Sequence, residues 1–594
     1  MASPRPSISA GSRHSGSTVI SLDDANDNKQ EKKVEQQQQQ QHEQEQQGSS
    51  QQDEKKPAQD DDNANTSTKK SPLEILRIIV LLFGMMLSMF TVTINSTLVA
   101  PAMTMIATDL HALNNSTWIA TAFMVGMVGL QPLSGKFADI FGRKPVLLFG
   151  LSLFLLGSLV NALSPSINGL IAGRALQGTG SGNIIPILYV VIADIAPLKW
   201  RPRMQSMMSL IYGLSSVVGP LIGGAFVDNL SWRWDFWLDV ILAGIAIIIN
   251  TLLLKETGQP RTESIMTKIK RIDILGVITV IAFIVCLLLG VTWGPQYGWS
   301  DSHSIGAFVG AGVALIALII VETRVAKEPL MPREVMLNPG IFIVYMYMSC
   351  LGLSFMGTLY FAPMMYQAVF GADATGSGIR LIPFVVCLII GSVSSGILLP
   401  RFPYCKVFII VGAASNVLGY GLFSTVDENA NWGRQACFLM FSGLAFGLSQ
   451  LNAIMGVQSV AGKKYMAIAT SLNNFFMLLC GSLAISVYQT VLQTFLQAQL
   501  VGVSQDVLAI ANEYGALSNY LYIRDMPQEY QGPIIHAYMN ALHNVFIIPL
   551  VAGGIGFICA CFIRNIKYGV GLRPAPKKDA EAAPQQETSP NNKQ

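Results

Sequence analysis

The sequence predicts an all-α membrane protein with fourteen transmembrane helices. Of its 594 residues, 51% are hydrophobic and only 13% are charged, which is unlike the surface composition of a soluble protein. A helix needs roughly 20 apolar residues to cross a hydrocarbon core of about 30 Å. Fourteen runs meet this requirement: residues 77 to 99, 117 to 136, 145 to 163, 168 to 192, 205 to 227, 236 to 254, 273 to 293, 304 to 322, 341 to 366, 379 to 399, 405 to 425, 434 to 455, 467 to 491 and 542 to 563.

The distribution of Lys and Arg supports this count and predicts an orientation. Connections after the even-numbered runs hold 18 of these residues, whereas connections after the odd-numbered runs hold four: Arg233, Arg380, Arg434 and Arg524. Cytoplasmic loops of membrane proteins are enriched in positive residues. We therefore expect both termini in the cytoplasm, and a soluble protein with buried helices is disfavoured.

The two ends of the chain have a different composition from the rest. Residues 1–72 include "QQQQQQHEQEQQ" and almost no large apolar side chains, and residues 567–594 are similarly polar. Such segments cannot bury enough apolar surface to fold. We expect both to be disordered cytoplasmic tails.

Motifs for metal or nucleotide binding are not found. The eight cysteines lack ligand spacing, "GTGSG" lies inside an apolar run, and "GVQSVAGKK" has Lys where a phosphate-binding loop needs Ser or Thr. No nucleophile, base or metal cluster is assembled either. We expect no cofactor, no metal, no nucleic-acid partner, no enzymatic activity and no ATP-driven pumping.

The stretch "GKFADIFGRK", residues 135 to 144, concentrates charge between the second and third runs. It resembles the signature loop of the major facilitator superfamily, and Gly135, Asp139, Gly142, Arg143 and Lys144 match that pattern. Glycines allow close helix approach and tight turns, while the acid can pair with a cation. We interpret these residues as a cytoplasmic gate, against the simpler interpretation that the charges only set topology.

Other stretches extend this resemblance over roughly residues 77 to 490. "GILLPRFPYCK" at 396 to 406 resembles a decayed second copy of the gate, as expected of a repeated fold. "GLSSVVGPLIGG" is similar to the antiporter helix motif, with Gly219, Pro220, Gly223 and Gly224. "RALQGTGSG", "SWRWDFW" and "LYFAPMMYQAVFGADATGSGIRLIP" are similar to the fourteen-span drug:proton antiporter branch.

This resemblance implies a domain organisation. We expect a six-helix bundle over residues 73–254, a linker with two extra central helices over residues 255–335, and a second six-helix bundle over residues 336–566.

The sequence also departs from that branch. Val92 stands where relatives carry a first-span aspartate, and Met477 stands where they tend to carry an arginine. Asp239 stands where relatives commonly have Asn. It is either a coupling acid or, as we favour from the sequence, a solvated carboxylate near a helix end.

Polar residues in spans that line the cavity of relatives are the candidates for substrate binding or coupling. They are Arg174, Gln177, Asp239, Asn95, Tyr360, Gln367, Gln450 and Asn473. Each can instead hold helices together by hydrogen bonds. Only Arg174 stands above that alternative, because a lone cation inside the membrane costs roughly 2.5 to 3.5 kcal/mol. An arginine without a first-span acid suits an anionic or neutral amphipathic substrate.

Three asparagines lie in glycosylation sequons on the predicted outer side: Asn114, Asn115 and Asn229. We expect a glycoprotein if these sites are used.

The resemblance implies a secondary-active transporter that exports drugs, toxins or secondary metabolites by proton antiport with alternating access. Small-molecule substrate, protons and the lipid bilayer are then its partners. We expect a monomer in the plasma membrane. Vacuolar uptake of amino acids, in the vacuolar membrane, and a transporter-like sensor without flux remain as alternatives.

Overall fold

The computed structural model describes residues 72–112, 116–255, 264–423, 425–517, 520–565 and 567–568. Within these residues, thirteen helices are long and apolar enough to cross a membrane. One of them, α16 (Trp432–Leu500), has 69 residues and is interrupted at Gly462, whose φ of 62° and ψ of −173° are not helical. It therefore contains two spans, and the fourteen predicted helices are accounted for.

The first six spans come from consecutive helices of the N-terminal part. They are α2 (Pro72–Asp109), α3 (Ser116–Phe141), α4 (Arg143–Leu163), α5 (Ile167–Ile195), α6 (Arg201–Asn229) and α7 (Arg233–Leu253). Helix α5 packs against both α3 and α4 and is the most enclosed, with 83% of its apolar window buried. Its many small residues allow this close packing, since small side chains let helix backbones approach each other.

The last six spans are built in the same way. They lie in α12 (Pro339–Ala368), α13 and α14 (Ala374–Ile379 and Ile382–Leu398), α15 (Cys405–Phe423), the two parts of α16, and α18 (Gln528–Phe562). Helix α16 packs against α12, α14 and α15 and lies at the centre of this part. Short α17 (Gln505–Glu513) and η4 (Tyr520–Asp525) precede α18.

Two more helices, α9 (Ile274–Tyr297) and α10 (Ser302–Ile320), lie between these parts in the chain. Helix α9 packs against α3 and also against α16, so it contacts spans from both parts. Helix α10 packs on α9 and exposes Ile305, Val309, Val313 and Ile316, as a lipid-facing helix would. The short helices α8 (Ile265–Lys270) and α11 (Arg333–Met336) flank this pair in the chain.

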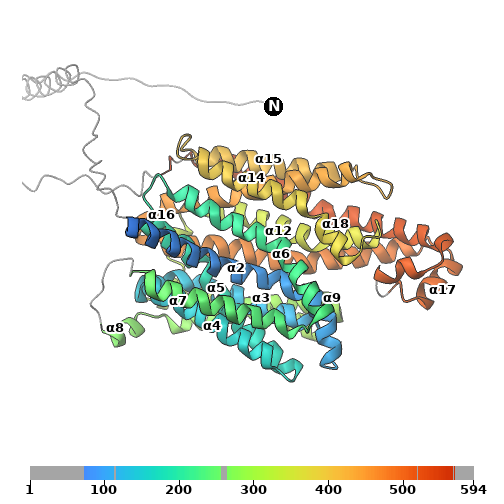
Figure 1. Cartoon of the computed structure of the whole chain (residues 1–594), viewed down its shortest axis with the longest axis horizontal. Coiled ribbons are helices and arrows are strands. Elements are labelled where there is room, and N and C mark those ends of the chain that lie inside the picture. The colour runs from blue at the N-terminus through green and yellow to red at the C-terminus, as the bar shows by residue number, and fades with distance from the viewer. Residues whose placement is uncertain are drawn as a thin grey trace, which may run out of the picture. The chain divides into compact units, whose positions relative to one another are not determined.

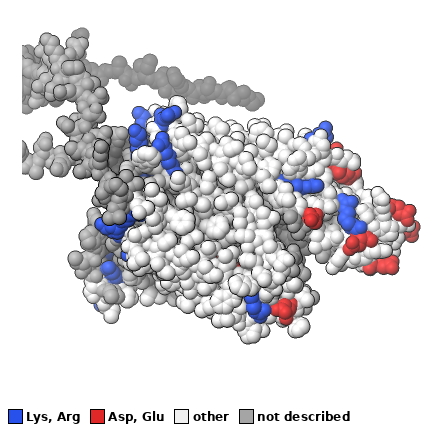
Figure 2. All heavy atoms as spheres, in the orientation of Figure 1, with Lys and Arg blue, Asp and Glu red and all other residues white. Residues whose placement is uncertain are grey.

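The long helices run side by side, and the connections gather at two opposite ends (Figure 1). Helix α8 lies at one end and α17 lies at the other (Figure 1). On the visible face, a wide band without charged side chains separates an end marked by Lys and Arg from an end where Asp and Glu also occur (Figure 2). We call the first end cytoplasmic, following the positive-inside rule, and the second end outer.

Candidate transport pathway

The gate motif is mostly helical rather than a loop. Helix α3 continues to Phe141 and α4 begins at Arg143, so Gly142 alone connects them. Its φ of 102° is in the region that side-chain-bearing residues avoid, which explains the glycine. The sequence predicted a short turn here but not that the turn is a single residue.

The charged residues of the motif hold the cytoplasmic ends of neighbouring helices. Arg143 pairs with Asp139 (Nη2 to Oδ1, 3.1 Å) and with Asp194 at the end of α5 (Nε to Oδ2, 3.1 Å). Lys144 Nζ donates to the carbonyl oxygen of Thr251 in α7 at 2.7 Å. These contacts join α3, α4, α5 and α7 within the N-terminal part.

Gly135 marks the place where the two parts of the chain meet. A methyl group on Gly135 would collide with the backbone of Ala467 and Ile468 in α16. One residue away, Ser134 Oγ donates to Ser471 Oγ at 2.9 Å. We call this α3–α16 contact the cytoplasmic seam. The predicted second copy is arranged alike, because Gly396 of α14 packs against Pro202 and Ser206 of α6.

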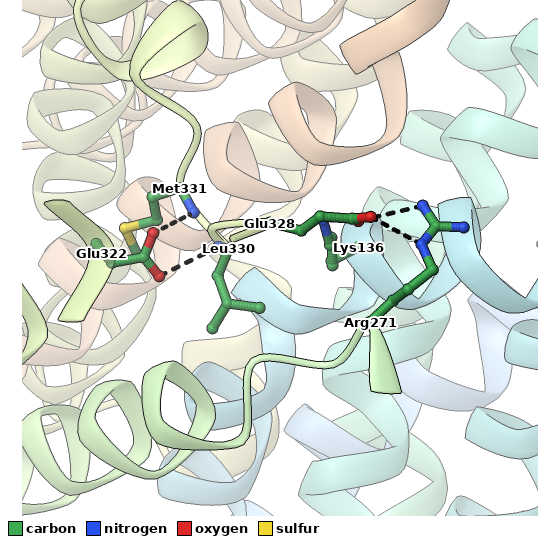
Figure 3. Close-up of polar contacts among 6 residues, drawn as sticks. All are labelled: Lys136, Arg271, Glu322, Glu328, Leu330 and Met331. Carbon is green, nitrogen blue, oxygen red and sulfur yellow. Dashed lines mark hydrogen bonds and ion pairs between the residues drawn. The ribbon is translucent and has the colours of Figure 1, made fainter. Parts of the chain in front are cut away.

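An acidic residue of the linker, which was not among the residues predicted from the sequence, contacts α3 one residue from Gly135. Glu328 accepts hydrogen bonds from Lys136 Nζ at 2.8 Å and from Arg271 Nε and Nη2 at 2.8 and 3.1 Å (Figure 3). The Arg271 hydrogen bonds, followed by Lys136, lower the pKa of Glu328 to about 2. Glu322 fixes the same segment by accepting the backbone N–H groups of Leu330 and Met331, both at 3.1 Å (Figure 3).

The second feature of the pathway is a polar network buried in the outer half of the N-terminal part. Arg174 Nη1 donates to Asn95 Oδ1 and to Gln177 Oε1, both at 2.8 Å. Asn95 Nδ2 and Gln177 Nε2 in turn donate to Asp239 Oδ2 at 2.5 and 3.0 Å. The structure thus brings together four predicted residues from α2, α5 and α7.

Asp239 is fully buried, so the interpretation favoured from the sequence, a solvated carboxylate near a helix end, is wrong. Arg174 is 3% exposed, its Nε donates to the carbonyl oxygen of Ile119, and its guanidinium lies 4.3 Å from the centre of the Phe123 ring. Buried charges are retained where they are compensated and hydrogen-bonded. Arg174 and Asp239 compensate each other through Asn95 and Gln177.

The third feature is a cavity of about 430 Å³ in the outer half. Its walls come from α2, α3, α9, α12 and the second part of α16, so it is bordered by both parts and by one extra helix. Its polar lining is uncharged and consists of Thr121, Thr292, Gln296, Tyr360, Ser482, Ser486, Gln489 and Gln493. An adjoining cavity of about 380 Å³ shares Tyr360, Gln489 and Gln493.

The remaining predicted substrate residues lie in different places. Tyr360 lines both cavities. Gln367 Nε2 instead donates to Ser377 Oγ at 2.9 Å, which holds helices together. Gln450 and Asn473 are buried in α16, and neither amide atom of Asn473 has a hydrogen-bond partner among the described residues. They do not line the two outer cavities.

The antiporter helix motif lies where α6 crosses α2. A methyl group on Gly219 would meet Thr97, and one on Gly223 would meet the Leu98 carbonyl, whereas Gly224 faces open space. Pro220 lies within α6, as predicted. Of the predicted glycosylation sites, Asn229 is exposed at the outer end of α6, and Asn114 and Asn115 lie outside the described residues.

Comparison with known proteins identifies this architecture. Residues 85–485 match the Major Facilitator Superfamily, which is more than half of the chain. The chain belongs to the major facilitator superfamily. An uncharacterized MFS-type transporter of Mycobacterium tuberculosis is 30% identical over 488 residues, covering 82% of this chain and 69% of the relative. The protein is therefore a multi-pass membrane transporter rather than an enzyme, as predicted.

Two further relatives have names that state a role. Efflux pump aflT of Aspergillus parasiticus is 29% identical over 84% of this chain and 95% of its own length. Multidrug transporter protein MdtP of Bacillus subtilis is 28% identical over 86% of this chain and 97% of its own length. The structure of the proton:xylose symporter XylE has a TM-score of 0.53 with 13% identity, covering 84% of this chain and 98% of that chain, and confirms the major facilitator fold.

Proposed function

We propose that this transporter exports small organic molecules across the plasma membrane, as a monomer, by exchanging them for protons in alternating access. The observation that carries the proposal is the closed cytoplasmic seam combined with a cavity in the outer half. A closed cytoplasmic side with a cavity in the outer half fits the conformation in which an exporter releases its substrate to the outside. The efflux pump and the multidrug transporter among the relatives favour export over uptake.

The cavity lining favours an uncharged amphipathic substrate. Its hydrogen-bonding groups are hydroxyls and amides, while Met103, Met124, Leu288 and Ile485 supply apolar surface. A charged substrate would lose its hydration there without gaining an ionic partner. Arg174 does not line this cavity, so of the anionic and neutral substrates that the sequence suggested, the neutral ones are favoured.

The test is transport into sealed inside-out vesicles that contain the full chain. With the lumen acidified, an exporter that exchanges protons accumulates its substrate, and a protonophore abolishes the accumulation. A panel of uncharged, anionic and cationic amphipathic compounds and of amino acids gives the substrate class. Accumulation of amino acids alone would favour vacuolar uptake, and no gradient-dependent movement of any compound by folded protein would contradict the proposal. Imaging a fluorescently tagged copy in cells shows whether the protein resides in the plasma membrane or in the vacuolar membrane.

A further inference from the structure

Helix α7 carries two buried carboxylates near its outer end. Asp235 lies in the first turn and Asp239 follows one turn later, and both are 0% exposed. Residues four apart lie on the same face of a helix. The two acids therefore share one buried environment, although only Asp239 was singled out from the sequence.

The hydrogen bonds of these carboxylates are incomplete. Asp239 Oδ2 accepts from Asn95 and Gln177, but Asp239 Oδ1 and both oxygens of Asp235 have no hydrogen-bond partner among the described residues. Most buried polar atoms in proteins are hydrogen-bonded. An orphaned carboxylate in this position calls for an explanation.

Within the part of the chain that the structure describes, the cation that acts on Asp239 is Arg174 of α5, whereas the charged group that acts on Asp235 is Asp239. Asn95 of α2 donates to Asp239. Gln177 donates to Ser158 of α4 and accepts from Asn161 of the same helix. The described side chains of α6 add no charge to the two acids. The buried group therefore contains two carboxylates and one guanidinium.

Charge balance then requires a proton. An ionised carboxylate without a partner costs several kcal/mol in a low-dielectric interior, and two carboxylates that share a site do not both ionise readily. One proton makes the group of Asp235, Asp239 and Arg174 neutral. Asp235, which lacks partners, is its natural carrier in this conformation.

The site lies just beneath the outer surface and is covered. Trp232, 3% exposed, donates from Nε1 to Asp109 Oδ2 at 3.0 Å, and the Arg233 guanidinium lies 4.2 Å from the Trp232 ring. Arg233 also binds Asp109 (Nη1 to Oδ2, 3.3 Å) and the Ser164 carbonyl oxygen (3.1 Å). Trp232 is the N-cap of α7, directly before the turn that carries Asp235, so these contacts close the outer end of the site.

The network also reaches the cavity wall. Arg174 contacts Ile119 and Phe123 on one side of α3, while Ala120, Thr121 and Met124 on the same helix line the cavity. We propose that Asp235 and Asp239 together bind the proton that drives export, in place of the missing first-span acid, and that α3 transmits their charge state to the cavity. This inference rests on the proposed proton-coupled export.

The first test detects the proton without any transported compound. Infrared difference spectra of the full-length protein in lipid are recorded between about pH 6 and pH 10, where exposed carboxylates stay ionised, and are expected to contain a protonated carboxylic acid band. Asp235→Asn and Asp239→Asn are expected to remove or shift it, Asp235→Glu to keep it at an altered position, and the exposed-site control Asp506→Asn to leave it unchanged. A wild-type band that persists unaltered in the Asp235→Asn/Asp239→Asn double variant would overturn the proposal.

The second test measures coupling, with the compound that wild-type protein accumulates in the vesicle assay. Both Asn variants are expected to lose gradient-driven accumulation at least tenfold while they keep exchange of labelled for unlabelled compound at equal pH. Retained gradient-driven accumulation in both variants would overturn the proton site. Wild-type protein that shows the infrared band but moves no compound would support the proton site and overturn the proposed export instead.

Discussion

At the scale of single residues, the sequence identified the members of the polar network but not how they are connected. Arg174 and Asp239 are rare charges in apolar spans, which is a strong signal by itself. Their linkage through Asn95 and Gln177 joins residues up to 144 positions apart, which depends on helix packing that the sequence does not reveal. Asp235 was missed because it follows "SWRW" at a span end, where a carboxylate is usually solvated.

The charge balance of this network predicts an unequal response to mutation. Arg174→Met leaves Asp239 buried without a cation, which we expect to lower the free energy of unfolding by about 3 kcal/mol. Adding Asp239→Asn removes the unpaired charge and is expected to recover part of that loss. Thermal unfolding of the purified variants in detergent measures both effects.

The matched control is Arg434→Met, since Arg434 is exposed and its loss is expected to change stability by less than about 0.5 kcal/mol. If the Arg174→Met/Asp239→Asn variant is less stable than Arg174→Met alone, the two charges do not compensate each other and the network has been misinterpreted.

At the scale of elements, hydropathy was sufficient to place the spans, whereas the linker could not be interpreted from sequence. The break at Gly462 divides α16 as the two apolar runs predicted. The segment after α10 shows only scattered charges, which usually indicates a solvated loop. Its Glu328 reaches Lys136, 192 residues earlier, and such a contact leaves no local pattern.

The ion pairs of Glu328 with Lys136 and Arg271 predict that the linker helps to keep the cytoplasmic seam closed. Glu328→Gln leaves Lys136, 8% exposed, without its counter-ion, and we expect the seam to open about tenfold more often, or about 1.4 kcal/mol. Hydrogen exchange of α3 residues 134–141 and α16 residues 463–471 reports the opening. The exposed Glu513→Gln at the outer end is the control, and equal exchange in both variants would show that Glu328 does not hold the seam.

The same contact predicts a pH profile for wild-type protein. Glu328 has a lowered pKa of about 2, so its contribution is complete above the ordinary value of 4.5 and is lost only as the pH falls through about 2. After correction for intrinsic exchange rates, seam opening is expected to be constant between pH 5 and 8. A marked change in that interval would assign the closure to another titrating group.

At the scale of the whole molecule, alternating access requires the seam to separate while the outer half closes. Ser134 and Ser471 lie on α3 and α16 with their hydroxyl oxygens 2.9 Å apart. Disulfides need Cβ atoms about 3.8 Å apart, which this approach permits. We therefore expect Ser134→Cys/Ser471→Cys to form a bond on oxidation and to trap the protein with its cytoplasmic side closed.

The trapped protein is expected to lose transport nearly completely and to regain it after reduction, as measured in the same vesicles. Each single cysteine variant controls for the native cysteines, because oxidation should leave its transport unchanged. A crosslinked protein that still transports at the wild-type rate would mean that the two halves need not part at this seam. Substrate would then have to reach the outer cavity by another path, and α9 borders that cavity while packing on both α3 and α16.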